Sequence, residues 1–472
     1  MQSRKEKLHR KDRRYRVEVR TVKLLNIALF VIPFAVSWFA YYRAHVCGSP
    51  SIVRSLCMMA MYTTLYCIFA RVYDAFLITM KRISEVFFSQ LLAGAMTDAF
   101  IVCIMSVICG RIPNLLPITC VFLIQTMMSI LWAKYSYIWL FSRYERIKTA
   151  IIYDRSRNMK DMFDSYGLDR KYDICSVCTV EEFFAEDMRA LENVEAVFLG
   201  GIRSHERNVI IKHCVALGID AYMLPRIGDI IMSGATKMHM FHLPILRVRR
   251  YSPPPEFKIL KRTFDIVSSL AAIVVLSPVM LAVAVAIKKH DGGPVFYKQV
   301  RLTKDGKTFE ILKFRSMRTD AEKDGIARLS TGTNDDRITP IGHFIRKCRL
   351  DELPQLFNIL RGEMSVVGPR PERPEIAAQY EKEIPEFALR LQAKAGLTGY
   401  AQVYGKYNTD PYDKLQMDLM YIANPSIWED MKIILVTIYV LFAKDSTEGV
   451  QADQVTALGN GSVRDEDETK PA

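Results

Sequence analysis

The chain has 472 residues, enough for two or three domains, and half of its residues are hydrophobic. This apolar content and a mean hydropathy of +0.07 exclude an ordinary soluble enzyme. The formal net charge of +13 indicates anionic partners, such as phospholipid headgroups, phosphorylated substrates or nucleic acid. The ten cysteines do not follow a secreted disulfide framework, and the single CxxC at Cys175 and Cys178 lacks the second pair of a zinc site.

Four apolar stretches in the first 150 residues predict a block of transmembrane helices over residues 1–148. A span needs about 20 apolar residues, so three stretches are long enough, whereas residues 55–70 are short and their full crossing is left open. Cations gather before the first stretch, after the second and after the fourth, so the positive-inside rule places both ends of the block in the cytoplasm. The basic run over residues 1–20 is expected to meet anionic lipid, not nucleic acid. The four stretches are residues 24–42, 55–70, 86–109 and 115–141.

Residues 149–250 alternate short apolar runs with helical patterns, which predicts a Rossmann-like α/β domain with a parallel sheet. We expect strands at 196–201 and 219–225 and a helix at 205–218 between them. The first strand of this region leads into Tyr153 with no G-x-G-x-x-G, so its backbone cannot approach a pyrophosphate closely. We therefore predict a non-catalytic or regulatory module whose ligand is left open.

A fifth apolar run, residues 264–287, is long enough to span a bilayer. Cations flank both of its ends, at 258–262 and 288–289, and Ser277-Pro278 falls at its midpoint. Proline removes a helical hydrogen bond, so we predict a re-entrant helix-break-helix that dips into one leaflet and returns, with the Ser277 hydroxyl as a partner for a freed carbonyl. The alternative is a kinked fifth span, which would place everything downstream outside the cell.

Two adjacent carboxylates, Asp351 and Glu352, stand at a predicted helix start just after a basic approach. Pro354 is tolerated there because first-turn N–H groups have no helical partner. The cations of the approach and the free N–H groups of a helix start would both favour a phosphate group beside this pair. The alternative is a surface Asp-Glu pair that only caps the helix.

The carboxy-terminal part of the chain resembles the bacterial sugar transferase family, the monotopic phosphoglycosyl transferases. The resemblance covers roughly residues 256–445, within a predicted catalytic α/β domain over 256–447. Together with the four spans and the α/β module, it resembles the large, polytopic-anchored branch, which begins exopolysaccharide, capsule or O-antigen assembly. The ordered motifs that carry the resemblance lie at 292–317, 346–371, 395–405 and 418–438.

The resemblance implies that a hexose-1-phosphate moves from a UDP-sugar to undecaprenyl phosphate, with release of UMP. It implies that Asp351 is the nucleophile and that Glu352 helps to hold Mg²⁺. Three positions depart from the usual pattern, at Thr303, Ala395 and Tyr400, and none of them touches the acidic pair. The implied location is the bacterial inner membrane with the catalytic domain on the cytoplasmic face, and a homodimer is one alternative for the oligomeric state.

Further candidate residues fall into three groups. Arg301, Lys313 and Arg315 are anion-contact candidates in a strand-turn-strand that turns at Asp305-Gly306. Asp418 and Tyr421 either complete a phosphate or uridine site or pack inside the fold. By resemblance, the phosphate-contacting positions are Lys313, Arg315, Arg346 and Arg370, and the membrane-hairpin positions are Lys261, Arg262, Phe264, Asp265, Ser277 and Pro278.

Two other functions stay open on the sequence: a glycosyl transferase that moves only the sugar and releases UDP, and a non-enzymatic membrane scaffold or nucleotide sensor. The apolar residues 431–442 predict either a helix in the membrane interface or a buried core helix. The polar, acidic residues 448–472 predict a disordered tail.

Overall fold

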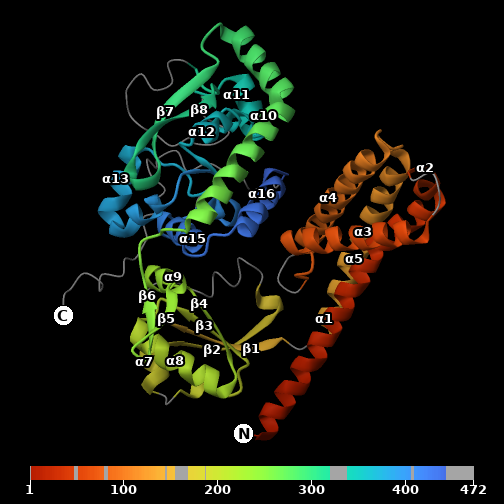
Figure 1. Ribbon diagram of the computed structural model, residues 1–472. Coiled ribbons are helices and arrows are strands. Elements are labelled where there is room, and N and C mark those ends of the chain that lie inside the picture. Colours follow the sequence, from red (N-terminus) through yellow and green to blue (C-terminus); the bar gives the residue numbers. More distant parts are fainter. Residues whose placement is uncertain are drawn as a thin grey trace. The chain divides into compact units, whose positions relative to one another are not determined.

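The computed structural model describes residues 2–46, 51–78, 83–143, 146–154, 168–185, 188–318, 337–405 and 409–442. The chain divides into two compact units, residues 1–224 and residues 225–472 (Figure 1). The domain boundaries expected at 148, 250 and 447 are finer than this division and stay predictions. The tail that was expected to be disordered lies outside the described residues.

Long apolar helices form the first part of the chain, as the hydropathy predicts. α1 continues through a π-helical turn, Trp38–Tyr42, into the short helix α2, so that one candidate span runs over Val17–His45. The segment whose crossing was open is a helix of 21 residues, long and apolar enough to cross. The four apolar stretches are thus confirmed as helices, and the protein is a membrane protein. Their bounds are α1 Gln2–Ser37, α2 Arg43–Val46, α3 Ile52–Val72, α4 Ile83–Cys109 and α5 Leu116–Arg143.

Buried hydrogen bonds join the helices of this block. The Tyr62 hydroxyl of α3 donates to Asp98 Oδ1 of α4 at 2.8 Å. Gln125 of α5 donates through Nε2 to the Tyr62 hydroxyl and to the carbonyl of Phe30 in α1, each at 2.8 Å. Because lipid gives helices no hydrophobic reason to associate, such contacts and close packing hold a membrane bundle together.

The α/β region contains the parallel sheet that the sequence predicts, with strand order β2-β1-β3-β4. The strands expected at 196–201 and 219–225 and the helix expected at 205–218 are confirmed within one or two residues. Phe183 of α7 and Cys214 of α8 pack against inward-facing residues of β1 and β3, such as Ile152 and Val197. The bounds are β1 Ile147–Tyr153, β2 Tyr172–Thr179, α7 Val180–Ala185, β3 Ala196–Gly200, α8 Ser204–Leu217 and β4 Asp220–Met223.

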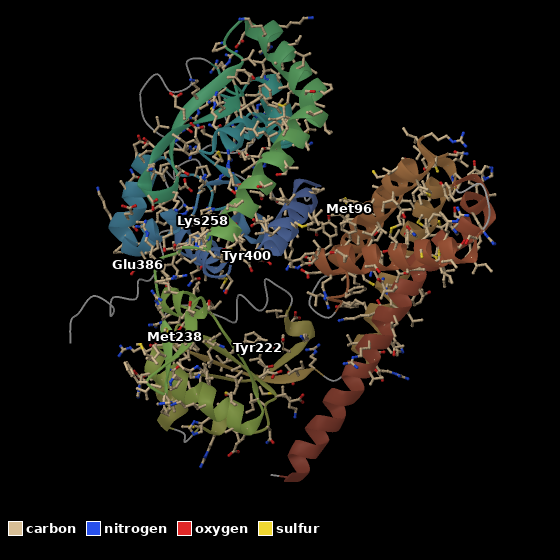
Figure 2. The ribbon with its side chains drawn as sticks, viewed as in Figure 1. Met96, Tyr222, Met238, Lys258, Glu386 and Tyr400 are labelled. Carbon is tan, nitrogen blue, oxygen red and sulfur yellow. The ribbon has the colours of Figure 1, made fainter. Side chains whose placement is uncertain are left out.

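Residues 225–250 group with the second unit. α9 (Ile227–Ser233) places Ile227 and Ile230 in the same apolar core as Leu415 and Leu419. It is followed by the antiparallel hairpin of β5 (Thr236–Met240) and β6 (Leu243–Arg247), on which Figure 2 labels Met238. The division into two units therefore falls before α9.

α10 (Pro255–Asp291) is one continuous helix of 37 residues that contains Pro278. The expected separation into two helices is therefore not seen in the secondary structure, although the ribbon changes direction part-way along its length (Figure 1). Proline at 278 removes the N–H that would bond the carbonyl of Val274, and the Ser277 hydroxyl donates to that carbonyl instead, at 2.8 Å. The expected role of Ser277 is confirmed.

The remaining elements of the second unit build one α/β fold around an apolar core. β7 and β8 form the expected strand-turn-strand, with Asp305 and Gly306 at positive φ in the turn. β9 and β10 pair in parallel, and α12, α13 and α15 contribute residues such as Leu356, Tyr380 and Leu415 to the core. The bounds are β7 Phe296–Leu302, β8 Thr308–Phe314, α11 Pro340–Lys347, α12 Gln355–Arg361, β9 Ser365–Val367, α13 Pro374–Glu383, β10 Gly396–Thr398, α14 Tyr400–Tyr404, α15 Pro411–Ala423 and α16 Ile427–Phe442.

Candidate active site

The acidic pair lies in a single 3₁₀ turn, Leu350–Glu352, between α11 and α12. α12 begins at Gln355, three residues after Glu352, so the expected helix start lies just beyond the pair, and Pro354 precedes the helix instead of standing in its first turn. Arg349, which precedes the turn, has a φ of 55°, a left-handed conformation that costs a non-glycine residue about 1–2 kcal/mol. The chain thus turns sharply just before Asp351, and this turn sets the direction from which the acidic pair enters the site.

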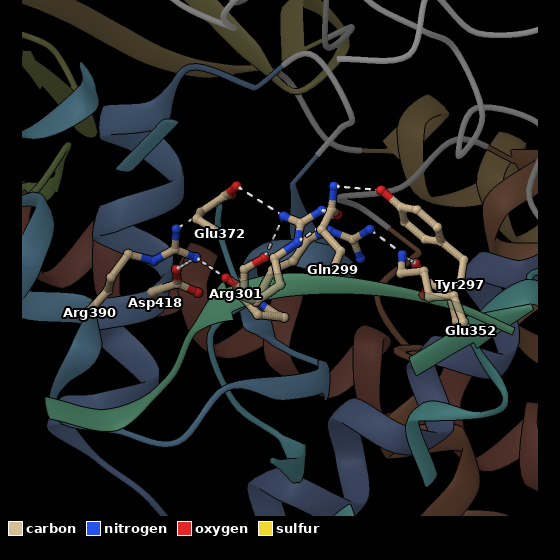
Figure 3. Close-up of polar contacts among 10 residues, drawn as sticks. Tyr297, Gln299, Arg301, Glu352, Glu372, Arg390 and Asp418 are labelled. Carbon is tan, nitrogen blue, oxygen red and sulfur yellow. Dashed lines mark hydrogen bonds and ion pairs between the residues drawn. The ribbon is translucent and has the colours of Figure 1, made fainter. Parts of the chain in front are cut away.

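Two cations from distant parts of the chain meet on Glu352 (Figure 3). Lys313 Nζ on β8 and Arg370 Nη2 in the loop after β9 each lie 3.1 Å from Glu352 Oε1. Burial raises the pKa of Glu352, but the charges of Lys313, Arg370 and Arg349 outweigh it and hold the pKa well below its usual range. Glu352 is therefore ionised at neutral pH.

Asp351 has the opposite electrostatic environment. The residue is 8% exposed, and burial together with the neighbouring charge of Glu352 raises the pKa of its carboxyl. The charges of Lys313, Arg346 and Arg349 act against this rise. Two adjacent carboxyls with pKa values shifted in opposite directions are typical of a site that gives them different roles.

The structure brings four of the expected residues together with Asp351. Lys313 and Arg370 each contact Glu352, the neighbour of Asp351 in the chain. Arg346 lies on the last turn of α11, where its charge favours ionised Asp351. Lys313, Arg346 and Arg370 are three of the four positions that the resemblance implies for phosphate contact.

Arg315 makes its contacts elsewhere. Its guanidinium hydrogen-bonds both carboxylate oxygens of Asp291, and its Nε donates to the carbonyl of Pro294 at 2.8 Å. The hydrogen bond to Arg315 lowers the pKa of Asp291 to about 2. Arg315 therefore joins the end of α10 to β8, and none of these contacts supports the phosphate-binding role expected for it.

Arg301 supports the loop that carries Arg370. It donates to Gln299 Oε1 from Nε and Nη2, at 3.1 and 2.7 Å, and to the carbonyl of Pro371 from Nη1, at 3.1 Å. Burial lowers the pKa of Arg301 to about 10, so the guanidinium stays charged at neutral pH.

The candidate residues at the start of α10 fix this helix to α12 and β9. Arg262 donates to the carbonyls of Ile359 and Leu360, at 2.6 and 2.7 Å. Its positive charge at the carboxy-terminal end of α12 interacts favourably with the dipole of that helix. Asp265 Oδ1 accepts hydrogen bonds from the Ser365 hydroxyl and the Val366 N–H, each at 3.0 Å.

Lys261 and Tyr421 meet at a residue that the sequence analysis missed. Lys261 Nζ lies 2.7 Å from Asp430 Oδ2, and the Tyr421 hydroxyl donates to Asp430 Oδ1 at 2.8 Å. Asp430 follows the start of an apolar helix, which gives no local sign that its carboxylate is buried.

Asp418 is inside the fold, 1% exposed, with its carboxylate 2.7 Å from Arg390 Nη2. The sequence analysis did not select Arg390 or its second partner, Glu372. A buried arginine has no distinctive local pattern, although the apolar neighbours in "FALRL" at 387–391 are a weak sign of burial. Of the two alternatives for Asp418 and Tyr421, their burial favours packing inside the fold.

The described residues contain no group of three or more His, Cys, Asp or Glu side chains that could hold a metal ion. Mg²⁺ is commonly bound by one or two carboxylates together with substrate phosphates and water. Asp351 and Glu352 fit that manner of binding, because adjacent carboxylates supply the hard oxygen ligands that Mg²⁺ prefers. Cys175 and Cys178 are free thiols.

Comparison with known proteins shows the family of the region that contains this site. The family described as "Bacterial sugar transferase" matches residues 256–444. A UDP-glucose:undecaprenyl-phosphate glucose-1-phosphate transferase of Caulobacter vibrioides is 38% identical over 209 residues, which are 43% of this chain and 78% of that protein. The chain belongs to the bacterial sugar transferase family.

Other relatives of this bacterial sugar transferase differ in the sugar that they are named for. A UDP-N-acetylgalactosamine-undecaprenyl-phosphate N-acetylgalactosaminephosphotransferase of Aeromonas hydrophila is 39% identical over 48% of this chain and 53% of its own length. A UDP-glucose:undecaprenyl-phosphate glucose-1-phosphate transferase of Klebsiella pneumoniae is 42% identical over 40% of this chain and 41% of its own length. The chain thus matches about half of the length of these relatives.

Proposed function

We propose that this bacterial sugar transferase moves a sugar-1-phosphate from a UDP-sugar to undecaprenyl phosphate, releases UMP, and so begins the synthesis of a polysaccharide. The observation that carries the proposal is the pair Asp351–Glu352 with Lys313 and Arg370 on Glu352 Oε1. Relatives named for glucose and for N-acetylgalactosamine match this chain with similar identity, so the sugar is left open.

In the proposed reaction, a carboxylate oxygen of Asp351 attacks the phosphorus that bears the sugar. The bond from that phosphorus to the oxygen shared with UMP breaks, and UMP leaves with the electron pair. An oxygen of undecaprenyl phosphate then attacks the same phosphorus, and the bond to Asp351 breaks. The carboxylate is regenerated, and the covalent intermediate replaces one difficult displacement with two easier ones.

The cations around the pair address the main electrostatic obstacle. A carboxylate and a diphosphate repel each other, and Lys313, Arg346 and Arg370 supply positive charge at the approach. The raised pKa of Asp351 means that its carboxylate is a stronger base, once ionised, than an ordinary aspartate.

We propose that Glu352, with Asp351 next to it, holds Mg²⁺. When bound, the ion would neutralise charge on the diphosphate and on the leaving UMP. The protein side of this site is the ionised Glu352, whose low pKa keeps it available as an oxygen ligand across the neutral range.

We further propose that α10 enters one leaflet and does not cross. Support comes from the packing of both ends of this helix on the same fold: Arg262 and Asp265 bind α12 and β9, while Met280 and Ile287 pack with Phe314. A helix that crossed the bilayer would carry its two ends to opposite sides of the hydrocarbon, where a single fold on one side could not bind both of them.

The face of α10 that points away from this fold is apolar and exposed. Val267, Val274, Val275 and Leu281 are each more than 60% exposed, as expected for side chains that meet lipid. With the positive-inside pattern of the first helices, we propose that the catalytic fold lies on the cytoplasmic face of the membrane.

The test of the function is a donor screen with the purified full chain in nanodiscs, with undecaprenyl phosphate as acceptor. Release of UMP from at least one UDP-sugar is the expected result. Release of UDP instead would identify a transferase that moves only the sugar. Nucleotide binding without turnover, retained when residues 256–472 are deleted, would identify a sensor or scaffold.

A further inference from the structure

Arg390 is a buried arginine that does not contact the acidic pair, yet it binds the loop that reaches it (Figure 3). Its side chain is 5% exposed and lies in the 3₁₀ helix Pro385–Gln392, stacked over the ring of Phe387 at 4.9 Å. Nη2 lies 2.7 Å from Asp418 Oδ2 and donates to the carbonyl of Arg370 at 3.0 Å. Nη1 lies 3.6 Å from Glu372 Oε1.

The loop in question is held along its main chain. Each carbonyl of the four consecutive residues 369–372 accepts a hydrogen bond, two from backbone N–H groups and two from arginine side chains. In chain order the donors are Gly396 N at 2.8 Å, Arg390 Nη2 at 3.0 Å, Arg301 Nη1 at 3.1 Å and Leu302 N at 2.9 Å.

The Arg370 side chain, in contrast, is 41% exposed where its Nη2 reaches Glu352 Oε1. A long, partly exposed side chain loses rotamer freedom when it is held in one geometry. Fixing the main chain of Arg370 reduces the number of ways in which its guanidinium can leave Glu352. The hydrogen bond from Arg390 to that main chain therefore helps to keep the Arg370 guanidinium in contact with Glu352.

We propose that Arg390 is a positioning residue: held by Asp418 and Glu372, it fixes the main chain of Arg370 so that the Arg370 guanidinium stays on Glu352. The catalytic consequence of this inference rests on the proposed function. The structural consequence, an ordered loop over residues 368–372, does not.

The charges that face Asp418 come from three elements. They are Arg390 in the 3₁₀ helix, Glu372 in the loop before α13, and Lys414 on α15 itself. Burial raises the pKa of Asp418 to about 6, against the lowering effect of Arg390 and Lys414. Asp418 is thus about half ionised near pH 6, so its pair with Arg390 is charged at neutral and higher pH and weakens as the pH falls through that value.

A double-mutant cycle tests whether Arg390 acts through Arg370. The variants are Arg390→Met, Arg370→Met and the double variant, each as the full chain in nanodiscs, with kcat/KM for UMP release as the readout. We expect Arg390→Met to lower kcat/KM about 10- to 100-fold in the wild type, but less than about threefold in the Arg370→Met background. Equal losses in the two backgrounds would show a general structural role and overturn the inference.

The matched control is Arg250→Met. It breaks another arginine–aspartate pair of the same unit, Arg250–Asp305 at 2.8 Å, which is solvent-exposed. We expect it to leave kcat/KM within about twofold of the wild type, as for most exposed ion pairs.

Hydrogen exchange supplies a readout that needs no turnover. The Gly368 N–H donates to the carbonyl of Thr398 at 2.9 Å, and the Gly396 N–H to that of Pro369. We expect both amides to exchange faster in Arg390→Met than in Arg250→Met, and unchanged exchange would overturn the inference. Faster exchange in a protein whose wild type releases no UMP would keep the positioning role and reject the proposed function.

Arg390→Lys carries the same measurements if Arg390→Met does not fold. It keeps a cation beside Asp418, but one ammonium group does not reproduce the planar fork that joins Asp418, Glu372 and the Arg370 carbonyl. We expect an intermediate loss of kcat/KM that again disappears in the Arg370→Met background.

Discussion

Lys313 Nζ lies 3.1 Å from Glu352 Oε1, and this contact joins strand β8 to the 3₁₀ turn that carries the acidic pair. Lys313 itself is buried enough that its pKa is lowered, mainly by desolvation, while the charge of Glu352 opposes that shift. Each of the two groups stabilises the charged form of the other in a site with little water. The charges of this pair also shift the pKa of Asp351: Glu352 raises it and Lys313 lowers it.

Asp351→Asn removes the proposed nucleophile. Because an amide cannot form the mixed anhydride, UMP release should fall by at least about a thousandfold, while the neutral side chain should be tolerated where burial already raises the pKa of Asp351. The measurement is UMP release by the purified variant, with the thermal transition as a check of folding. Asp305→Asn, in the exposed turn between β7 and β8, is the control. Near-normal turnover in the Asp351 variant would reject the mechanism.

Lys313→Met should shift the acid limb of the pH–activity profile to higher pH. The positive charge of Lys313 lowers the pKa of Asp351, so its removal should raise that pKa and require a higher pH to ionise the nucleophile. The pH dependence of kcat in wild type and variant measures this shift. Lys298→Met, which breaks the exposed pair with Glu310 in the same hairpin, should leave the limb in place. A limb that moves to lower pH would contradict the assignment.

Ser277→Ala should destabilise the protein by about 1 kcal/mol, because it leaves the Val274 carbonyl without the hydroxyl that now bonds it. Pro278→Ala restores a backbone N–H to the same carbonyl. The Ser277→Ala change should then cost much less in the Pro278→Ala background. Denaturation of the four proteins in one detergent gives the coupling between the two positions, and equal costs in both backgrounds would show that the hydroxyl does not replace the missing N–H.

The membrane orientation can be tested with introduced thiols in a chain whose native cysteines are replaced by serine. Lys307, exposed in the catalytic fold, should react as Lys307→Cys with a membrane-impermeant maleimide only after the cytoplasmic membrane is opened. Ile112→Cys, in the loop between α4 and α5, should react in intact spheroplasts. Labelling of both positions from outside would mean that α10 crosses.

Several features of the fold follow from local sequence, and the structure has them where they were expected. The strands at 196–201 and 219–225 and the turn at Asp305-Gly306 all depend on residues close together in the chain. The expected separation into two helices at Pro278 is not seen, since α10 continues through this proline as one helix. Proline removes one hydrogen bond there, and the Ser277 hydroxyl compensates locally, so the helix need not end.

The partners of the arginines could not be derived in the same way. Arg315 lies two residues from Lys313 and belongs to the same basic motif, yet it binds Asp291, while Lys313 reaches Glu352. Lys313 lies in β8, whereas Arg315 lies one residue beyond the end of that strand, so the two side chains have different neighbours. A guanidinium binds the carboxylate that the packing places next to it.

By itself, the sequence determined that this is a membrane protein with apolar helices, a parallel α/β region and an acidic pair set among cations, because these are properties of composition, periodicity and short motifs. Only the tertiary structure decided which cations reach Glu352, and that Asp418 is bound to Arg390 inside the fold. Such contacts join elements far apart in the chain, and the packing of the core, not the local pattern, sets the distances between them.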